Sequence, residues 1–77
     1  MYSLYFERST GEKLLVKSQL EAPDDVFPLI KDFVHSKNPN FNIYYIRSWG
    51  ADPIIYDVGS HTEFFYLYKE EIHDVKQ

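Results

Sequence analysis

One stretch of the chain, residues 62–69, reads TEFFYLYK and is expected to form a strand with large side chains on both faces. Because side chains alternate along a strand, Phe65 and Leu67 point one way. The side chains that point the other way are those of Phe64, Tyr66 and Tyr68. A single helix covers only one face of a small sheet. The stretch therefore predicts a second apolar face that another element shields or that binds a partner.

Four further segments have the alternation, or the Ile and Tyr content, that is typical of strands. They are residues 2–7, 13–20, 41–48 and 54–58. Polar segments containing glycine are expected to form turns between strands. They are residues 9–12, 49–53 and 59–61.

Residues 26–37 are expected to form the helix. Asp24 or Asp25 is a candidate N-terminal cap, since a carboxylate accepts the free N–H groups of a first helical turn. Asn38 and Pro39 end the helix, because Asn tolerates a left-handed cap and Pro cannot continue a helix. The apolar stripe that should pack on the sheet is formed by Val26, Phe27, Ile30, Phe33 and Val34.

The elements follow the order β-β-α-β-β-β with short connections. This order predicts an α+β fold, with a mainly antiparallel five-stranded sheet and one helix packed on one face. The 77 residues are expected to form a single small domain, 1–77, with a polar tail that frays from about residue 70. The sequence does not determine the order of the strands within the sheet.

Composition excludes several classes of protein. The chain has no cysteine, which excludes disulfides and thiolate zinc sites. Its formal charge is −4, so nucleic acid is an unexpected partner, because nucleic-acid binding needs a basic stripe. No apolar run approaches the roughly 18 residues of a transmembrane helix, and the N-terminus lacks the pattern of a signal peptide. We therefore expect a cytoplasmic protein without membrane contact.

Two sets of reactive side chains raise the question of catalysis. The residue types of a nucleophilic triad are present in Asp57, Ser60 and His61, and the types that ligate zinc or iron in Asp57, His61, Glu63 and His73. The first set falls within a tight turn, and the second lacks the spacing of zinc motifs. We interpret the segment as a hairpin turn in which Gly59 adopts a positive φ. No catalytic, cofactor-binding or metal-binding residue is predicted.

Aromatic residues are unusually frequent, with seven Tyr, six Phe and one Trp. Tyr, Trp and Arg are the residues that most often anchor protein interfaces. The predicted partner-binding surface consists of Tyr44, Arg47, Trp49, Phe64, Tyr66 and Tyr68. Base stacking on single-stranded nucleic acid fits less well, because acidic residues flank the last strand. A second half of the core, a homodimer interface and a surface for another protein are all compatible with these residues.

Residues 55–65, IYDVGSHTEFF, resemble a pattern in small uncharacterised proteins of Gram-positive phages and prophages. In that pattern a strand, an Asp-x-Gly-Ser turn and a Phe-Phe strand follow a strand that contains Trp. The resemblance covers about residues 43–68 and carries no functional residues with it. It implies a phage or mobile-element accessory protein that binds and modulates or inhibits a host protein. A nucleic-acid-associated module and a small metal-dependent or hydrolytic enzyme are the alternatives.

Overall fold

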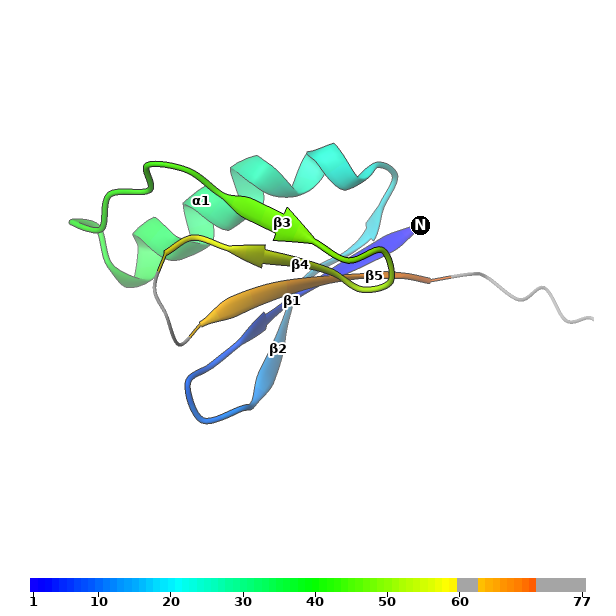
Figure 1. Cartoon of the computed structure of the whole chain (residues 1–77), viewed down its shortest axis with the longest axis horizontal. Helices are drawn as coiled ribbons and strands as arrows, with labels where there is room; N and C mark the ends of the chain where they lie inside the picture. Colours follow the sequence, from blue (N-terminus) through cyan, green and yellow to red (C-terminus); the bar gives the residue numbers. More distant parts are fainter. Residues whose placement is uncertain (60–62, 71–77) are drawn as a thin grey trace, which may run out of the picture.

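The computed structural model describes residues 1–59 and 63–70 (Figure 1). Within this part of the chain, five antiparallel strands form one sheet, and a 3₁₀ turn and an α-helix connect the second strand to the third. The elements are β1 (Tyr2–Glu7), β2 (Lys13–Leu20), η1 (Pro23–Asp25), α1 (Val26–Lys37), β3 (Arg47–Trp49), β4 (Ile54–Asp57) and β5 (Phe64–Lys69). The predicted α+β class and the predicted order of elements are confirmed.

The strands lie in the order β2-β1-β5-β4-β3, so the last strand of the described residues is the central one. On one side β5 pairs with β1, where Tyr66 is opposite Tyr5. On the other side it pairs with β4, where Tyr66 is opposite Ile55. Strand β5 therefore joins two local hairpins, β1–β2 and β3–β4, into one sheet.

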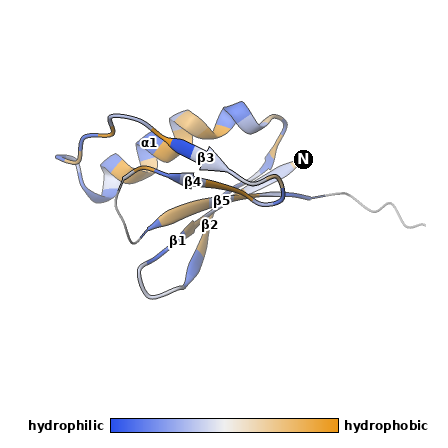
Figure 2. Cartoon of the chain, viewed as in Figure 1, coloured by the Kyte–Doolittle hydropathy of each residue, from blue (hydrophilic) through white to orange (hydrophobic). Residues whose placement is uncertain are grey.

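Helix α1 packs on one face of this sheet and forms the core with it (Figure 1). The Phe33 ring centroid lies 4.8 Å from that of Phe6 and 5.8 Å from that of Phe65, and Phe27 packs edge-on against Tyr56. Apolar residues are coloured orange on α1, β4 and β5 in Figure 2. The buried apolar residues are Leu4, Phe6, Leu20, Val26, Ile30, Tyr56, Val58, Phe65 and Leu67. The predicted helix and its apolar stripe are thus confirmed.

The predicted strand 41–48 is wrong over most of its length, because only Arg47–Trp49 pairs with β4. The earlier part of the segment closes the end of α1 instead. The Phe41 N–H donates to the Asn38 carbonyl at 3.0 Å, and the Phe41 carbonyl oxygen lies 3.2 Å from His35 Nε2. Phe41 and Ile46 pack against the core from the loop, so they are shielded from water without joining the sheet, whereas Tyr44 and Tyr45 remain exposed.

The two ends of α1 also differ from expectation. Asp25 occupies the N-cap position, but its carboxylate bonds back to the Ala22 N–H at 3.3 Å and makes no hydrogen bond to the helix. The physical reason is that η1 runs directly into α1 and uses this carboxylate to close its own turn. At the other end Asn38 has φ of −146°, so the cap is not left-handed. Gly59 does adopt the expected positive φ, at +92°, while the tail expected to fray lies, beyond residue 70, outside the described residues.

Candidate functional site

The face of the sheet opposite α1 carries the candidate site, and we call it the open face. Directly opposed residues of antiparallel strands share a face, so the register identifies its members. They are Ser3, Tyr5, Glu7, Lys13, Leu15, Arg47, Trp49, Ile55, Asp57, Phe64, Tyr66 and Tyr68. Within residues 1–59 and 63–70, no helix packs on this face (Figure 1).

One line of side chains crosses all five strands of the open face, and we call it the apolar row. In spatial order it consists of Leu15, Tyr5, Tyr66, Ile55 and Trp49. Its two ends are the most accessible, with Leu15 56% and Trp49 47% exposed. The three members between them are half-buried. A continuous apolar line that reaches both sheet edges is a contact surface of the kind that protein partners cover.

A second line, which we call the charged row, runs beside the apolar row. In spatial order it consists of Lys13, Glu7, Phe64, Asp57 and Arg47. Lys13 and Arg47 therefore lie on the two edge strands, Glu7 and Asp57 lie on the strands next to them, and Phe64 lies on the central strand. Each carboxylate thus lies opposite a basic residue on the adjacent edge strand.

The aromatic rings of the open face contact one another in the geometries that ring quadrupoles favour. Tyr5 and Tyr68 meet edge to face with centroids 5.6 Å apart. Tyr66 and Tyr68 stack at 6.5 Å, and Trp49 meets Phe64 edge to face at 6.4 Å. The rings thus form two groups, one of three tyrosines on β1 and β5 and one of Trp49 and Phe64 on β3 and β5.

Hydrogen bonds fix two of these tyrosines. Tyr66 Oη donates to Glu7 Oε1 at 2.8 Å, and this bond, together with burial, raises the pKa of Tyr66 above its ordinary value. Lys13 Nζ donates to Tyr68 Oη at 3.1 Å, which raises the pKa of Lys13, and it lies 4.6 Å from the Tyr66 ring centroid. The tyrosine rings are therefore held in place before any partner arrives.

An ion pair closes the opposite edge of the open face. An Arg47 guanidinium nitrogen lies 2.7 Å from Asp57 Oδ2, and this hydrogen bond raises the pKa of Arg47. The Gly59 N–H donates to Asp57 Oδ1 at 2.7 Å. The Asp57 side chain is 9% exposed, whereas that of Arg47 is 63% exposed. The carboxylate considered for catalysis therefore ties β3 to β4 and binds the backbone at Gly59.

Of the other residues considered for catalysis or metal binding, Glu63 alone lies within residues 1–59 and 63–70. Ser60, His61 and His73 lie outside the described residues, so neither the triad nor the full ligand set is placed. Glu63 is half-buried and lies at the edge of a cavity beneath α1. In the described part of the chain, no three His, Cys, Asp or Glu side chains gather closely enough to hold a metal ion.

The structure brings together five of the six residues predicted to bind a partner. Those on the open face are Arg47, Trp49, Phe64, Tyr66 and Tyr68. Tyr44 lies elsewhere, in the loop before β3, where it is 86% exposed and lines a hollow with Phe27 and Lys31. Sequence reasoning missed Tyr5, Leu15 and Ile55, although the alternation along their strands was a usable signal.

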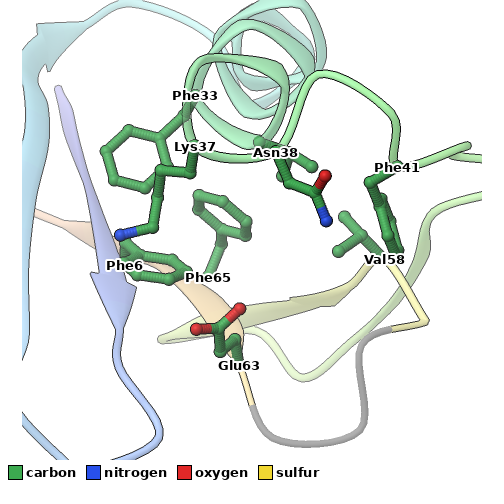
Figure 3. Close-up of a pocket in the computed structure, with 9 residues that line it drawn as sticks. Phe6, Phe33, Lys37, Asn38, Phe41, Val58, Glu63 and Phe65 are labelled. Carbon is green, nitrogen blue, oxygen red and sulfur yellow. The ribbon is translucent and has the colours of Figure 1, made fainter.

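Two concavities flank the sheet. A hollow of ≈ 460 Å³ on the open face is lined by Tyr5, Lys13, Tyr68, Lys69 and Glu70. A cavity of ≈ 70 Å³ lies under the C-terminal end of α1 and is walled by aromatic rings, with Lys37 over the Phe6 ring (Figure 3). The second is small beside the roughly 300–1,000 Å³ of ordinary ligand pockets, so the open face is the stronger candidate site.

Comparison of the chain with protein-family models, curated proteins and solved structures finds no match. Among residues 1–59 and 63–70, the helical segments are too short and too polar to cross a bilayer. The function therefore has to be inferred from the geometry of the open face.

Proposed function

We propose that this chain is a non-enzymatic module that binds a protein partner through the open face of its sheet. The observation that supports this proposal is the apolar row, which crosses all five strands on the face opposite α1. Tyr and Trp, flanked by Arg, are the side chains that contribute most to protein interfaces. Because hydrogen bonds and ring contacts already hold the tyrosine side chains in place, less side-chain entropy is lost when a partner docks.

Two features favour a protein over single-stranded nucleic acid. Base stacking needs free ring faces, but Lys13 Nζ lies over the Tyr66 ring and Tyr66 stacks on Tyr68. Binding along a phosphate backbone needs a continuous stripe of cations, whereas the charged row has one basic residue at each sheet edge and carboxylates on the strands between them. Salt-sensitive binding of oligonucleotides would contradict this part of the proposal.

The resemblance of residues 55–65 to small phage and prophage proteins suggests the setting. In that setting the partner is a host protein, which the module modulates or inhibits by occupying a surface. Such a role needs no reacting group, only a rigid face of the right shape and chemistry.

The test places a carboxylate at each end of the apolar row. Trp49→Glu and Leu15→Glu should abolish capture of a partner from bacterial lysate by the immobilised chain, because a charge would be buried in the contact. Tyr44→Glu is the matched control, since it adds the same charge at an 86% exposed ring outside the open face. Circular dichroism confirms that each variant is folded, and mass spectrometry quantifies the captured protein.

The proposal fails if both end variants retain every captured protein, or if Tyr44→Glu loses the same protein to the same extent. A partner lost only with Tyr44→Glu would move the binding site to the loop before β3. A catalytic activity of the native chain that both Trp49→Glu and Leu15→Glu retain would contradict the non-enzymatic role.

A further inference from the structure

The size of the open face limits what can dock on it. Five strands span four spacings of about 4.8 Å, and two to three rows of side chains extend about 14 Å along the strands. The flat footprint of the platform is therefore about 300 Å², which is small beside a standard stable interface that buries about 800 Å² of accessible surface on each partner. A platform of this size matches a short extended segment better than the flat surface of a folded domain.

In the charged row the two cations, Lys13 and Arg47, are exposed, whereas Glu7 is half-buried and Asp57 is buried. The Glu7 carboxylate accepts the Tyr66 hydroxyl, and Asp57 is almost fully buried against Arg47 and the Gly59 N–H. Lys13 and Arg47 keep exposed head groups at the two edges, and each has more N–H donors than these bonds use. Although the whole chain carries −4, both ends of the open face offer donors for an anion.

The same distribution disfavours a second copy of the chain as the occupant. If two open faces met about a two-fold axis that runs along the charged row or crosses its centre, each end of that row would meet either its own copy or the opposite end. In both arrangements a cation would face a cation, Lys13 or Arg47 against Lys13 or Arg47. Like charges opposed across an interface weaken it, so the patch is poorly self-complementary.

We infer that the open face binds an extended acidic segment of its partner, with carboxylates at both ends and apolar or aromatic residues between them. An extended chain rises about 3.3 Å per residue, so about six residues reach from the β2 edge to the β3 edge. The end carboxylates lie against Lys13 and Arg47, and the residues between them cover Tyr5, Tyr66 and Ile55. The hollow beside Lys13 accepts one side chain of the segment. This inference rests on the proposed function and specifies its partner.

Selection from a yeast-displayed library of random twelve-residue peptides tests the inference with defined probes. The peptides that bind the purified full chain should be enriched in Asp and Glu separated by apolar residues. Fluorescence anisotropy should show that the best peptide weakens about threefold to fivefold with Lys13→Gln, as expected for the loss of one partly exposed ion pair. Lys13→Arg should restore binding.

Lys31→Gln is the matched control, because it removes the same charge from an exposed position on α1. It should leave the peptide affinity unchanged, while Trp49→Glu should abolish binding. Affinity should also fall as the salt concentration rises.

Three results of the peptide experiments would overturn the inference. They are a selection that yields no binder, selected peptides without acidic enrichment, and equal effects of Lys13→Gln and Lys31→Gln. Self-association in sedimentation equilibrium that Trp49→Glu removes would assign the open face to a second copy instead. If Trp49→Glu still abolishes capture of a protein partner while the peptides show no acidic enrichment, the proposed function stands and this inference alone fails.

Discussion

The two faces of β5 use neighbouring residues for different tasks. Toward α1, Phe65 and Leu67 are fully buried in the core, and their side chains contain no polar atoms. Toward the open face, Phe64, Tyr66 and Tyr68 remain half-buried. The two tyrosine hydroxyls on that side bond to side chains of the β1–β2 hairpin.

This difference explains how one strand can be apolar on both sides without a second covering helix. A phenol keeps its hydroxyl hydrated or hydrogen-bonded at the surface while its ring packs against neighbours. On the open face the rings therefore contribute packing, and their hydroxyls remain compatible with water. The covered face stabilises the fold, and the open face remains available for contact.

The largest expected effect comes from comparing Phe65→Ala with Phe64→Ala. Removal of the fully buried Phe65 ring should cost about 3–5 kcal/mol of unfolding free energy, a large part of the stability of a small domain. Phe64→Ala should cost clearly less, about 1–2 kcal/mol, because that ring is half-buried and packs mainly on Trp49. Urea denaturation followed by circular dichroism measures both. Equal losses would mean that the open face belongs to the core.

The next effect concerns the turn that holds Trp49 at the end of the apolar row. Gly50 has φ of +85°, and an added Cβ would lie 2.7 Å from the Pro53 carbonyl oxygen. Gly50→Ala should therefore cost about 2–3 kcal/mol, combining backbone strain with this clash. Gly11→Ala is the control, since Gly11 has φ of +92° but open space around it, and should cost about 1 kcal/mol. Thermal melts compare the two, and a smaller loss at Gly50 would show that the β3–β4 hairpin shifts freely.

The smallest expected effect is a change of stability with pH, to which one tyrosine on each face of the sheet contributes. The pKa values of Tyr56, on the covered face, and Tyr66, on the open face, are both raised, the first mainly by burial and the second mainly by its bond to Glu7. A raised pKa in the folded chain means that this contribution to stability is complete below about pH 10 and is lost as the pH rises further. The unfolding free energy should therefore fall above about pH 10.

Tyr66→Phe should lower stability at pH 7 by about 1 kcal/mol through loss of the hydrogen bond to Glu7. The same variant should make the loss above pH 10 less steep. Tyr44→Phe, at an 86% exposed ring, should match the native chain at pH 7. Urea titrations at pH 7 and pH 11 provide both comparisons, and a Tyr66→Phe profile as steep as the native one would contradict the assignment.

Local pattern was sufficient to predict most elements. Alternation predicted β1 and β2, and the apolar spacing from Val26 to Val34 predicted α1. The failure at residues 41–46 has a physical cause, because Phe41 can shield its ring from water either in a strand or as the plug at the end of a helix. The structure shows local contacts of Phe41 with Asn38 and His35 in place of strand pairing, a difference that alternation along the segment does not reveal.

The candidate site was predictable in part for the same reason. Alternation placed Phe64, Tyr66 and Tyr68 on one face, but the alignment of Tyr5 with Tyr66 depends on strand pairing across most of the chain. Tyr44 was included because a strand was expected around it, and that strand does not form there. Side-chain type and spacing thus located the face, and the strand order determined which residues form its row.

The central position of β5 has a consequence for how the protein is made. Tyr2 pairs with Lys69, so the sheet closes between residues from nearly opposite ends of the described chain. During synthesis, the β1–β2 and β3–β4 hairpins emerge from the ribosome first, and isolated hairpins are marginally stable in water. Pairings this distant in sequence also slow folding, because loop closure has to precede the contacts that stabilise it. A nascent chain that ends before Phe64 therefore lacks the strand that would join its two hairpins, and folding has to wait for the last strand to leave the ribosome.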